Sequence, residues 1–210
     1  MVMDTRPEWL RWAHEMQSIA QAGIAYGKDL YDIERFGELR RIAAEIVAAH
    51  TLAPKEAAAA VLALEEGYAT PKVDVRAAVF DREGSLLFVR ETSDGRWSLP
   101  GGWADVGESA GETAVREVRE EAGYEVVPTK LLGLLDRRKH PHPPMLWHVY
   151  KVFVRCKLIG GQPSQSLETD AARFFPRHEL PELSVGRVTE SQIARLFDHY
   201  DDPCLETDFD

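Results

Sequence analysis

One segment near the middle of the chain limits its fold and its chemistry more than any other. Residues 102–124 read GWADVGESAGETAVREVREEAGY. If residues 109–122 form a helix that turns 100° per residue, Glu117, Glu120 and Glu121 lie within about 100° of one another. Apolar residues of the same stretch lie on the other side, where a core can bury them. The segment therefore predicts an amphipathic helix with an acidic face.

The acidic face is typical of a metal site. Three carboxylates on one stripe repel one another, at a cost of roughly 0.2–0.5 kcal/mol per like-charged pair. A divalent cation turns this repulsion into attraction, and hard oxygen ligands suit Mg²⁺ or Mn²⁺. The alternative is a solvated acidic surface, which is the usual meaning of clustered glutamates. The glycines that flank the helix, together with Glu108 and Arg116 at their offsets, favour the metal site.

The residues around the helix agree with a ligand site. The cluster Leu99-Pro100-Gly101-Gly102 breaks regular structure, and its paired glycines let a backbone approach a ligand closely. Ser109 or Thr113 can cap the helix, and a glutamate follows Ser109 at the spacing of a capping box. Arg116 precedes a glutamate by four residues and can orient it. Gly123 stands where a helix ends in a left-handed residue.

The segment resembles the Nudix box. That pattern is glycine, five residues, glutamate, seven residues, Arg-Glu, an aliphatic residue, any residue, Glu-Glu, any residue, glycine and an apolar residue. Every position is filled, although Tyr124 stands where an aliphatic residue is commoner. The matching residues are Gly102, Glu108, Arg116, Glu117, Val118, Glu120, Glu121, Gly123 and Tyr124. Some Nudix-like domains are ligand sensors rather than enzymes, but they tend to lose box carboxylates, and none is lost here.

The resemblance implies roles for these residues. The metal ligands, and with them the catalytic carboxylates, would be the box glutamates with a glycine carbonyl, namely Glu117, Glu120, Glu121 and Gly102. Arg116 and Glu108 would orient those ligands. A carboxylate outside the box often completes a metal site or acts as the base, and Glu168 stands in such a context. Its alternative is an exposed turn residue.

Contacts to the substrate are predicted less directly. Arg76 and Arg90 lie on expected strands and could face phosphates, or they could be surface arginines. Trp103, beside the glycine pair, could stack on a base, and Trp97 is more often a core residue. Arg138 belongs to a basic, proline-stiffened loop that could hold a terminal phosphate or be simply solvated.

Composition excludes several classes of protein. The net charge is −10, from 25 basic and 35 acidic residues, which argues against a long nucleic acid as partner. It does not exclude a phosphate substrate, because bound metal ions reverse the local field. Two cysteines without a CxxC pattern argue against a disulfide scaffold or structural zinc. Without an apolar leader or a run of membrane-spanning length, we expect a cytoplasmic protein without membrane contact.

The pattern along the chain predicts two domains, residues 1–70 and 71–210. The first has three helical stretches, at about 9–23, 29–50 and 55–64. A DNA-binding reading of these helices is disfavoured because their stripes are apolar and their surface is not basic, so we expect a homodimer interface or a lid. The second domain has β-rich runs at 73–80, 85–90, 95–99, 125–136, 145–158 and 167–175, and a final helix at 189–200.

This order of elements predicts an α/β fold, in which a mixed sheet lies between helices. It matches the Nudix α/β/α sandwich, here preceded by a small helical domain. The strings YGKDLYDIERFGELRRIAAEI and TPKVDVRAAVF are similar to the helical extension of a Nudix subgroup. That subgroup hydrolyses small nucleotides, nucleoside diphosphates linked to another moiety, such as CDP-choline or ADP-ribose. The alternatives are hydrolysis of RNA 5′ ends or dinucleoside polyphosphates, and a non-catalytic nucleotide-sensing regulator.

Overall fold

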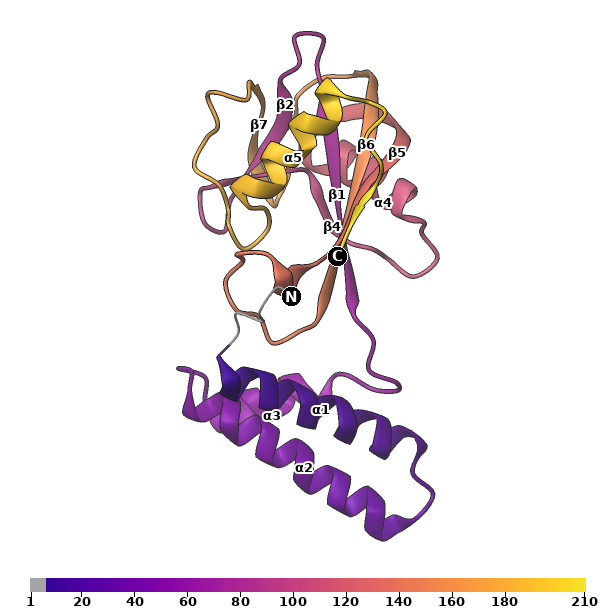
Figure 1. Ribbon diagram of the computed structural model, residues 1–210. Helices are drawn as coiled ribbons and strands as arrows, with labels where there is room; N and C mark the ends of the chain where they lie inside the picture. The colour runs from indigo at the N-terminus through magenta and orange to yellow at the C-terminus, as the bar shows by residue number, and fades with distance from the viewer. Residues whose placement is uncertain (1–6) are drawn as a thin grey trace. The chain divides into compact units, whose positions relative to one another are not determined.

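The computed structural model describes residues 7–210, which form two compact units (Figure 1). One unit, here called the helical unit, contains residues up to 71 together with 144–148. The other, the sheet unit, contains residues 72–143 and 149–210. Compactness does not show that either part folds alone, so the predicted domains 1–70 and 71–210 remain a prediction.

The helical unit consists of α1 (Glu8–Tyr26), α2 (Leu30–Ala49) and α3 (Lys55–Ala63). Asp29 caps α2, because its side chain accepts hydrogen bonds from the N–H groups of Tyr31 and Asp32 in the first turn. Gly23 lets α1 and α2 approach closely, since a Cβ at this position would collide with the ring of Phe36. A small core of alanines with Val47 and Leu62 joins the three helices.

The segment that enters the helical unit from the middle of the chain was predicted to be a strand. The prediction of a strand over 145–158 is wrong at its start, because β6 begins only at Val149. Leu146 and Trp147 instead pack against the core of the helices. Burying these two apolar side chains stabilises the segment outside the sheet. The apolar residues that suggested a strand therefore pack on the helices instead.

The sheet unit contains one mixed sheet of eight strands in the order β3-β2-β1-β6-β5-β8, with β4 paired to β1 and β7 to β2. Parallel pairs join β1 to β6 and β5 to β8, and the other pairs are antiparallel. The strands are β1 (Lys72–Phe80), β2 (Leu86–Glu91), β3 (Trp97–Ser98), β4 (Gly101–Trp103), β5 (Tyr124–Asp136), β6 (Val149–Gly161), β7 (Thr169–Phe175) and β8 (Asp208–Phe209).

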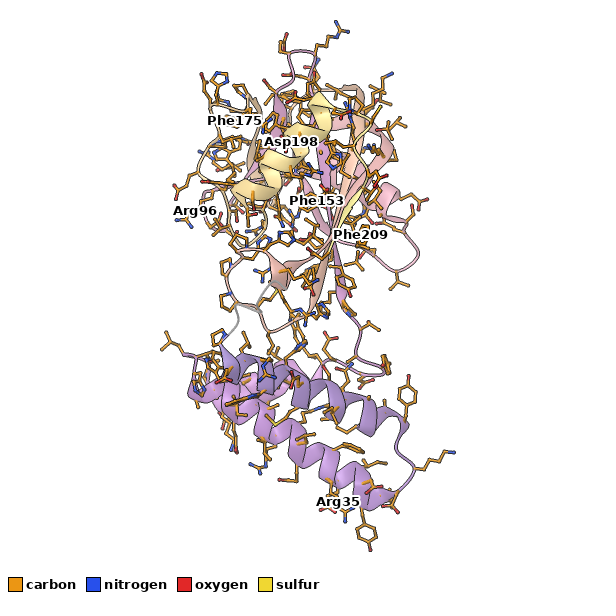
Figure 2. All side chains as sticks on the ribbon, viewed as in Figure 1. Arg35, Arg96, Phe153, Phe175, Asp198 and Phe209 are labelled. Carbon is orange, nitrogen blue, oxygen red and sulfur yellow. The ribbon has the colours of Figure 1, made fainter. Side chains whose placement is uncertain are left out.

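Helices cover both faces of this sheet. On one face α4 (Ala110–Glu117) packs on Val75, Ala77 and other apolar residues of the central strands. On the other face α5 (Glu190–Asp201) contributes Ile193, Leu196 and Phe197 to a second core. Phe153 and Phe175, both labelled in Figure 2, belong to that second core. The predicted α/β/α sandwich with a mixed sheet and a preceding helical region is confirmed.

The helix of the acidic segment begins and ends as predicted but changes type in the middle. Ser109 is its cap, and Ser109 and Glu112 form a capping box. The α-helix ends at Glu117, and residues 118–122 form a π-helical turn, which the predicted continuous α-helix did not include. Such single turns interrupt α-helices mainly at functional sites. Gly123 closes the turn in the left-handed region with φ of 74°.

No helix among residues 7–210 combines the length and the apolar character that a bilayer crossing requires.

Candidate active site

The acidic face of α4 and its π turn opens into a cavity of about 490 Å³. Strand β4, the helix and the segment before β7 each contribute to its wall. The lining residues are Gly102, Trp103, Asp105, Arg116, Glu117, Glu120, Glu121, Ser166, Leu167 and Glu168. Five carboxylates therefore meet one guanidinium in this cavity, and all the predicted metal ligands lie in its wall.

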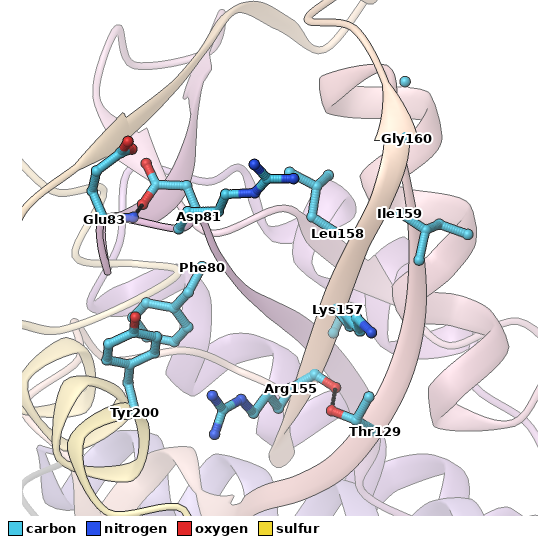
Figure 3. Close-up of a pocket in the computed structure, with 13 residues that line it drawn as sticks. Phe80, Asp81, Glu83, Thr129, Arg155, Lys157, Leu158, Ile159, Gly160 and Tyr200 are labelled. Atoms are coloured by element: carbon cyan, nitrogen blue, oxygen red, sulfur yellow. Dashed lines mark hydrogen bonds between the residues drawn. The ribbon is translucent and has the colours of Figure 1, made fainter.

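A second, larger cavity of about 810 Å³ lies elsewhere in the sheet unit, between the ends of β1 and β6 and the ring of Tyr200 (Figure 3). Its two carboxylates are Asp81 and Glu83, and the Asp81 carboxylate already accepts N–H groups of its own turn. None of the residues predicted to be functional lines it. The chemistry of the lining, rather than cavity size, selects the smaller cavity as the candidate site.

Arg116 organises the carboxylates of the smaller cavity. Its Nε donates to Glu108 at 3.0 Å, and one terminal nitrogen donates to Glu117 at 2.8 Å and to Glu120 at 3.3 Å. These bonds raise the pKa of the Arg116 guanidinium, with the bond to Glu108 as the largest cause. The same bond lowers the pKa of Glu108. Arg116 therefore holds three box glutamates around one positive charge.

Glu121 is the most enclosed of the box glutamates. One oxygen of its carboxylate accepts the N–H of Gly101 at 2.8 Å. Its backbone carbonyl accepts the hydroxyl of Thr169 at 2.6 Å, which ties the π turn to β7. Burial raises the pKa of Glu121 to about 8 against the lowering effect of the Gly101 bond. The Glu121 carboxylate thus lies in a place where burial disfavours its negative charge.

Gly102 leaves room for the carboxylate of Glu117. A Cβ at this glycine would lie 2.6 Å from Oε1 of Glu117, closer than carbon and oxygen atoms can approach. Burial also raises the pKa of Glu117, while its bond to Arg116 opposes the shift. The glycine of the motif is therefore explained by close contact between β4 and the acidic helix face.

The donor set fits a hard divalent cation. Among residues 7–210, no three acidic, histidine or cysteine side chains converge tightly enough to hold a metal ion as they stand. Arg116 currently pairs with two of the predicted ligands. However, two buried carboxylates with raised pKa values share this cavity with further acidic groups, and a cation of charge two compensates exactly that kind of excess. Binding would require the Glu117 and Glu120 carboxylates to turn from Arg116 toward the ion.

The residues predicted outside the helix divide into two groups. Glu168 and Trp103 line the cavity, both with exposed side chains. Glu168 lies in the turn before β7, whose N–H groups bind the Ser166 hydroxyl. Trp103, which is 48% exposed, presents an aromatic surface at the rim. Both positions are compatible with the roles assigned to them from the sequence, which remain predictions.

The three predicted substrate arginines do not line the cavity. Arg76 is buried and donates to Asp74 at 2.9 Å and to the Leu99 carbonyl at 3.1 Å. Arg90 forms a two-pronged pair with Asp170 at 2.6 and 3.0 Å. Arg138 forms a similar pair with its neighbour Asp136. Each guanidinium has a carboxylate partner within the chain, so the structure brings none of them into the candidate site.

Two functional contacts were missed at the sequence level. The N–H of Gly101 and the hydroxyl of Thr169 both fix Glu121, one through the side chain and one through the backbone. The glycine pair was an available signal, although it pointed only to a close approach. Thr169 had no signal of its own, because the pairing of β7 beside the π turn is a property of the whole fold.

A comparison with family models identifies both parts of the chain. The NUDIX domain model matches residues 70–197, well over half of the 210 residues. The chain belongs to the Nudix family. A second model, described as a UDP-X-like N-terminal oligomerisation domain, matches residues 7–62. The resemblance noted in the motif is confirmed, and the protein is a Nudix hydrolase with a helical extension.

Several relatives resemble this Nudix chain over most or all of its length. A putative ADP-ribose pyrophosphatase of Bacillus subtilis (strain 168) is 44% identical over 209 residues, which cover 100% of both chains. A solved UDP-X diphosphatase is 30% identical with a TM-score of 0.63, covering 97% of this chain and 98% of its own. An ADP-ribose pyrophosphatase from Streptococcus suis 89-1591 is 42% identical with a TM-score of 0.61, covering 67% and 100% respectively.

Proposed function

We propose that this Nudix hydrolase uses Mg²⁺ or Mn²⁺ to split the diphosphate bond of a nucleoside diphosphate linked to another moiety. The products are a nucleoside monophosphate and the phosphorylated moiety. The observation that carries the proposal is the cavity that five carboxylates and Arg116 line beside the box helix. The full-length relative named as a putative ADP-ribose pyrophosphatase and the UDP-X diphosphatase structure support this substrate class.

The chain's own residues would act as follows. Glu117, Glu120 and Glu121 hold the cation, with the Gly102 carbonyl as a further ligand. When bound, a divalent ion neutralises the diphosphate oxygens and lowers the pKa of water. Before the cation binds, Arg116 holds Glu117 and Glu120 at the cavity, and its bond to Glu108 keeps the guanidinium in place when those two carboxylates turn toward the ion.

The opposite wall of the cavity would complete the reaction. Glu168 accepts the proton of the attacking water, whose oxygen forms a new bond to phosphorus while the bridging P–O bond breaks. Trp103 offers its exposed ring to the base or sugar of the substrate. The exposed position of the Glu168 carboxylate leaves it free to move toward a bound diphosphate.

A panel of nucleotides tests the substrate class. We expect monophosphate release from CDP-choline, ADP-ribose or a UDP-linked sugar in the presence of Mg²⁺, and none in EDTA. Preferential turnover of dinucleoside polyphosphates or RNA 5′ ends would instead support the alternative enzyme activity. Tight nucleotide binding without turnover of any of these compounds, with or without metal, would support a sensing role and contradict the proposal.

Glu120→Gln and Glu121→Gln test the metal ligands. Each change keeps the shape of the side chain but removes the charge that holds a cation, so we expect kcat to fall at least about 100-fold. Thermal unfolding should show that both variants remain folded. Glu125→Gln, an exposed residue just beyond the motif, is the matched control and should retain parental kcat. Parental turnover by both metal-site variants would refute the assignment.

We also propose that the protein is a homodimer formed through the helical unit. The matching model for residues 7–62 is described as an oligomerisation domain. In support, Tyr31, Leu39 and Ile42 of α2 line one shallow pocket on the helix surface. Leu39 is half-buried, lies about two turns after Tyr31 and is one turn from Ile42. Tyr31 is 73% exposed and Ile42 is 40% exposed, an arrangement that a second copy of the chain could cover.

A further inference from the structure

Three basic side chains of the sheet unit are buried together outside the carboxylate cavity. Arg137, His142 and Lys151 are 6%, 8% and 0% exposed. Arg137 lies in the short helical turn η2 (Arg137–Lys139) after β5, His142 in the loop that follows, and Lys151 on β6. Basic side chains are rarely buried to this extent without partners for their polar atoms, so each partner is worth identifying.

Two of these side chains keep a polar nitrogen that has no hydrogen-bond partner among residues 7–210. Arg137 donates to the carbonyl of Gly186 at 3.4 Å, but its Nε has no hydrogen-bond partner in the described part of the chain. His142 binds the carbonyl of Val185 through Nδ1 at 2.8 Å, and its Nε2 has none. Because the two anchoring carbonyls belong to consecutive residues, the two side chains are held close together. The two carbonyls thus fix both groups, and each group keeps one enclosed nitrogen without a partner among the described residues.

The charge around these nitrogens is not balanced. Asp74 binds Lys151 through one carboxylate oxygen and Arg76 through the other. Glu121 and Glu91 also attract Arg76, whereas Asp74 is the carboxylate that acts on both Lys151 and Arg137. Burial lowers the pKa of Lys151 to about 8 and also lowers that of Arg137. Such uncompensated burial is costly, and an anionic ligand would relieve it.

The donor and acceptor pattern narrows the ligand further. Since Nδ1 of His142 donates to a carbonyl, Nε2 of the neutral ring is an acceptor. Arg137 and Lys151 supply N–H donors beside it. A group that is anionic and can also carry an O–H complements this set, and a hydrogen phosphate or phosphomonoester has both properties, whereas sulfate at neutral pH lacks the O–H. We propose that Arg137, His142 and Lys151 bind a phosphoryl group.

The proposed site is connected to the candidate active site through Arg76. Asp74 and Arg76 alternate along β1 with residues packed under α4, so their side chains lie on the sheet face that α5 covers. Arg76 reaches the Leu99 carbonyl, two residues before the N–H that binds Glu121. The phosphoryl group could be part of a substrate or product of the proposed reaction, or free phosphate.

Thermal unfolding with inorganic phosphate tests the site. In EDTA, which prevents metal-bridged binding at the carboxylates, 10 mM phosphate should raise the Tm of the parent by about 2–4 °C. Equal sulfate should raise it less. Arg137→Met should lose the rise, whereas Lys139→Gln, which removes the same charge from an exposed position in the same turn, should retain it.

The behaviour without phosphate separates binding from a structural role. Arg137→Met removes an uncompensated buried charge, so its Tm without phosphate should equal or exceed that of the parent. Should this variant fail to fold, His142→Gln keeps a donor for the Val185 carbonyl and should also lose the phosphate effect. The proposal is overturned if phosphate does not stabilise the parent, or if it stabilises the folded variant equally.

Kinetics identify the source of the group. If the phosphoryl group belongs to the substrate, phosphate inhibits competitively and Arg137→Met raises KM. If the ligand is free phosphate, phosphate still raises the Tm of the parent while the KM of Arg137→Met is unchanged. Either outcome supports the site. The unfolding experiment needs no turnover, so its result stands apart from the fate of the proposed hydrolase reaction.

Discussion

Two neighbouring glycines of the candidate site should respond differently to the same substitution. At Gly102 an added methyl group would meet the end of the flexible Glu117 side chain, which can move away. At Gly101 it would collide with the backbone carbonyl of Val75, and the φ of 148° is strained for any other residue. We expect Gly102→Ala to lower kcat at least about tenfold with less than about 1 kcal/mol lost in stability.

Gly101→Ala serves as the comparison. It should destabilise the fold by about 2 kcal/mol or more, because the backbone of β1 cannot yield as a side chain can. Urea unfolding and steady-state kinetics on the two variants check both expectations. Equal loss of stability in the two variants would show that Gly102 has a structural rather than a positioning role.

His142 predicts a pH dependence of stability. Burial lowers its pKa to about 4, and the charges of Lys151 and Arg137 act in the same direction, whereas the bond to Val185 opposes it. The unfolded chain binds this proton near pH 6.5 and the folded chain near pH 4. Stability from the neutral ring is therefore complete above pH 6.5 and falls, by up to about 3 kcal/mol, as the pH drops toward 4.

Urea unfolding of the parent and of His142→Gln at pH 4.5 and 7.5, in phosphate-free buffer, measures this contribution. The variant should lose less stability than the parent between the two pH values, since other groups titrate in both proteins. Identical losses would mean that the folded state binds the His142 proton as readily as the unfolded chain does.

At the scale of elements, the π turn depends on its contact with β7. The hydroxyl of Thr169 satisfies the buried Glu121 carbonyl, and Thr169→Val would keep the shape while leaving that carbonyl without a partner. We expect a loss of about 1–3 kcal/mol in stability and a lower kcat. Thr129→Val is the matched control, because its hydroxyl also donates to a backbone carbonyl, that of Arg155, but at an exposed site. An unchanged kcat in Thr169→Val would indicate that the π turn positions Glu121 without help from β7.

At the scale of the whole molecule, the exposed face of α2 predicts the oligomeric state. Sedimentation at micromolar concentration should show a dimer. Ile42→Arg should raise the dissociation constant at least about tenfold, since it places a charge in the proposed apolar contact. Ile159→Arg, an exposed isoleucine of the sheet unit, should leave the dimer intact. A monomer at these concentrations in the parent would refute the homodimer.

The sequence predicted what depends on local pattern and missed what depends on distant pairing. The acidic helix, its cap at Ser109 and its end at Gly123 follow from spacing within a single segment. The fold class and the family are confirmed by the structure and by the family models. Both were predictable because the motif lies within one segment and the order of the elements follows from local patterns. The arginine side chains were predicted less well. Arg90 meets Asp170 only after β2 and β7 have paired. Arg76 has Asp74 two residues away on its own strand, but its bond to the Leu99 carbonyl forms only in the folded sheet. The π turn was missed because no residue type in the segment marks the place where one residue is inserted into a helical turn.

The excursion of residues 144–148 into the helical unit has an evolutionary consequence. A module whose core is completed by Leu146 and Trp147 cannot be transferred by one recombination event at its carboxyl end. A donor gene without the matching inner loop would deliver three helices with a gap in their packing. Chimeras that exchange only the first 71 residues between relatives should therefore express poorly until the loop is exchanged as well, and the two gene segments should share one ancestry.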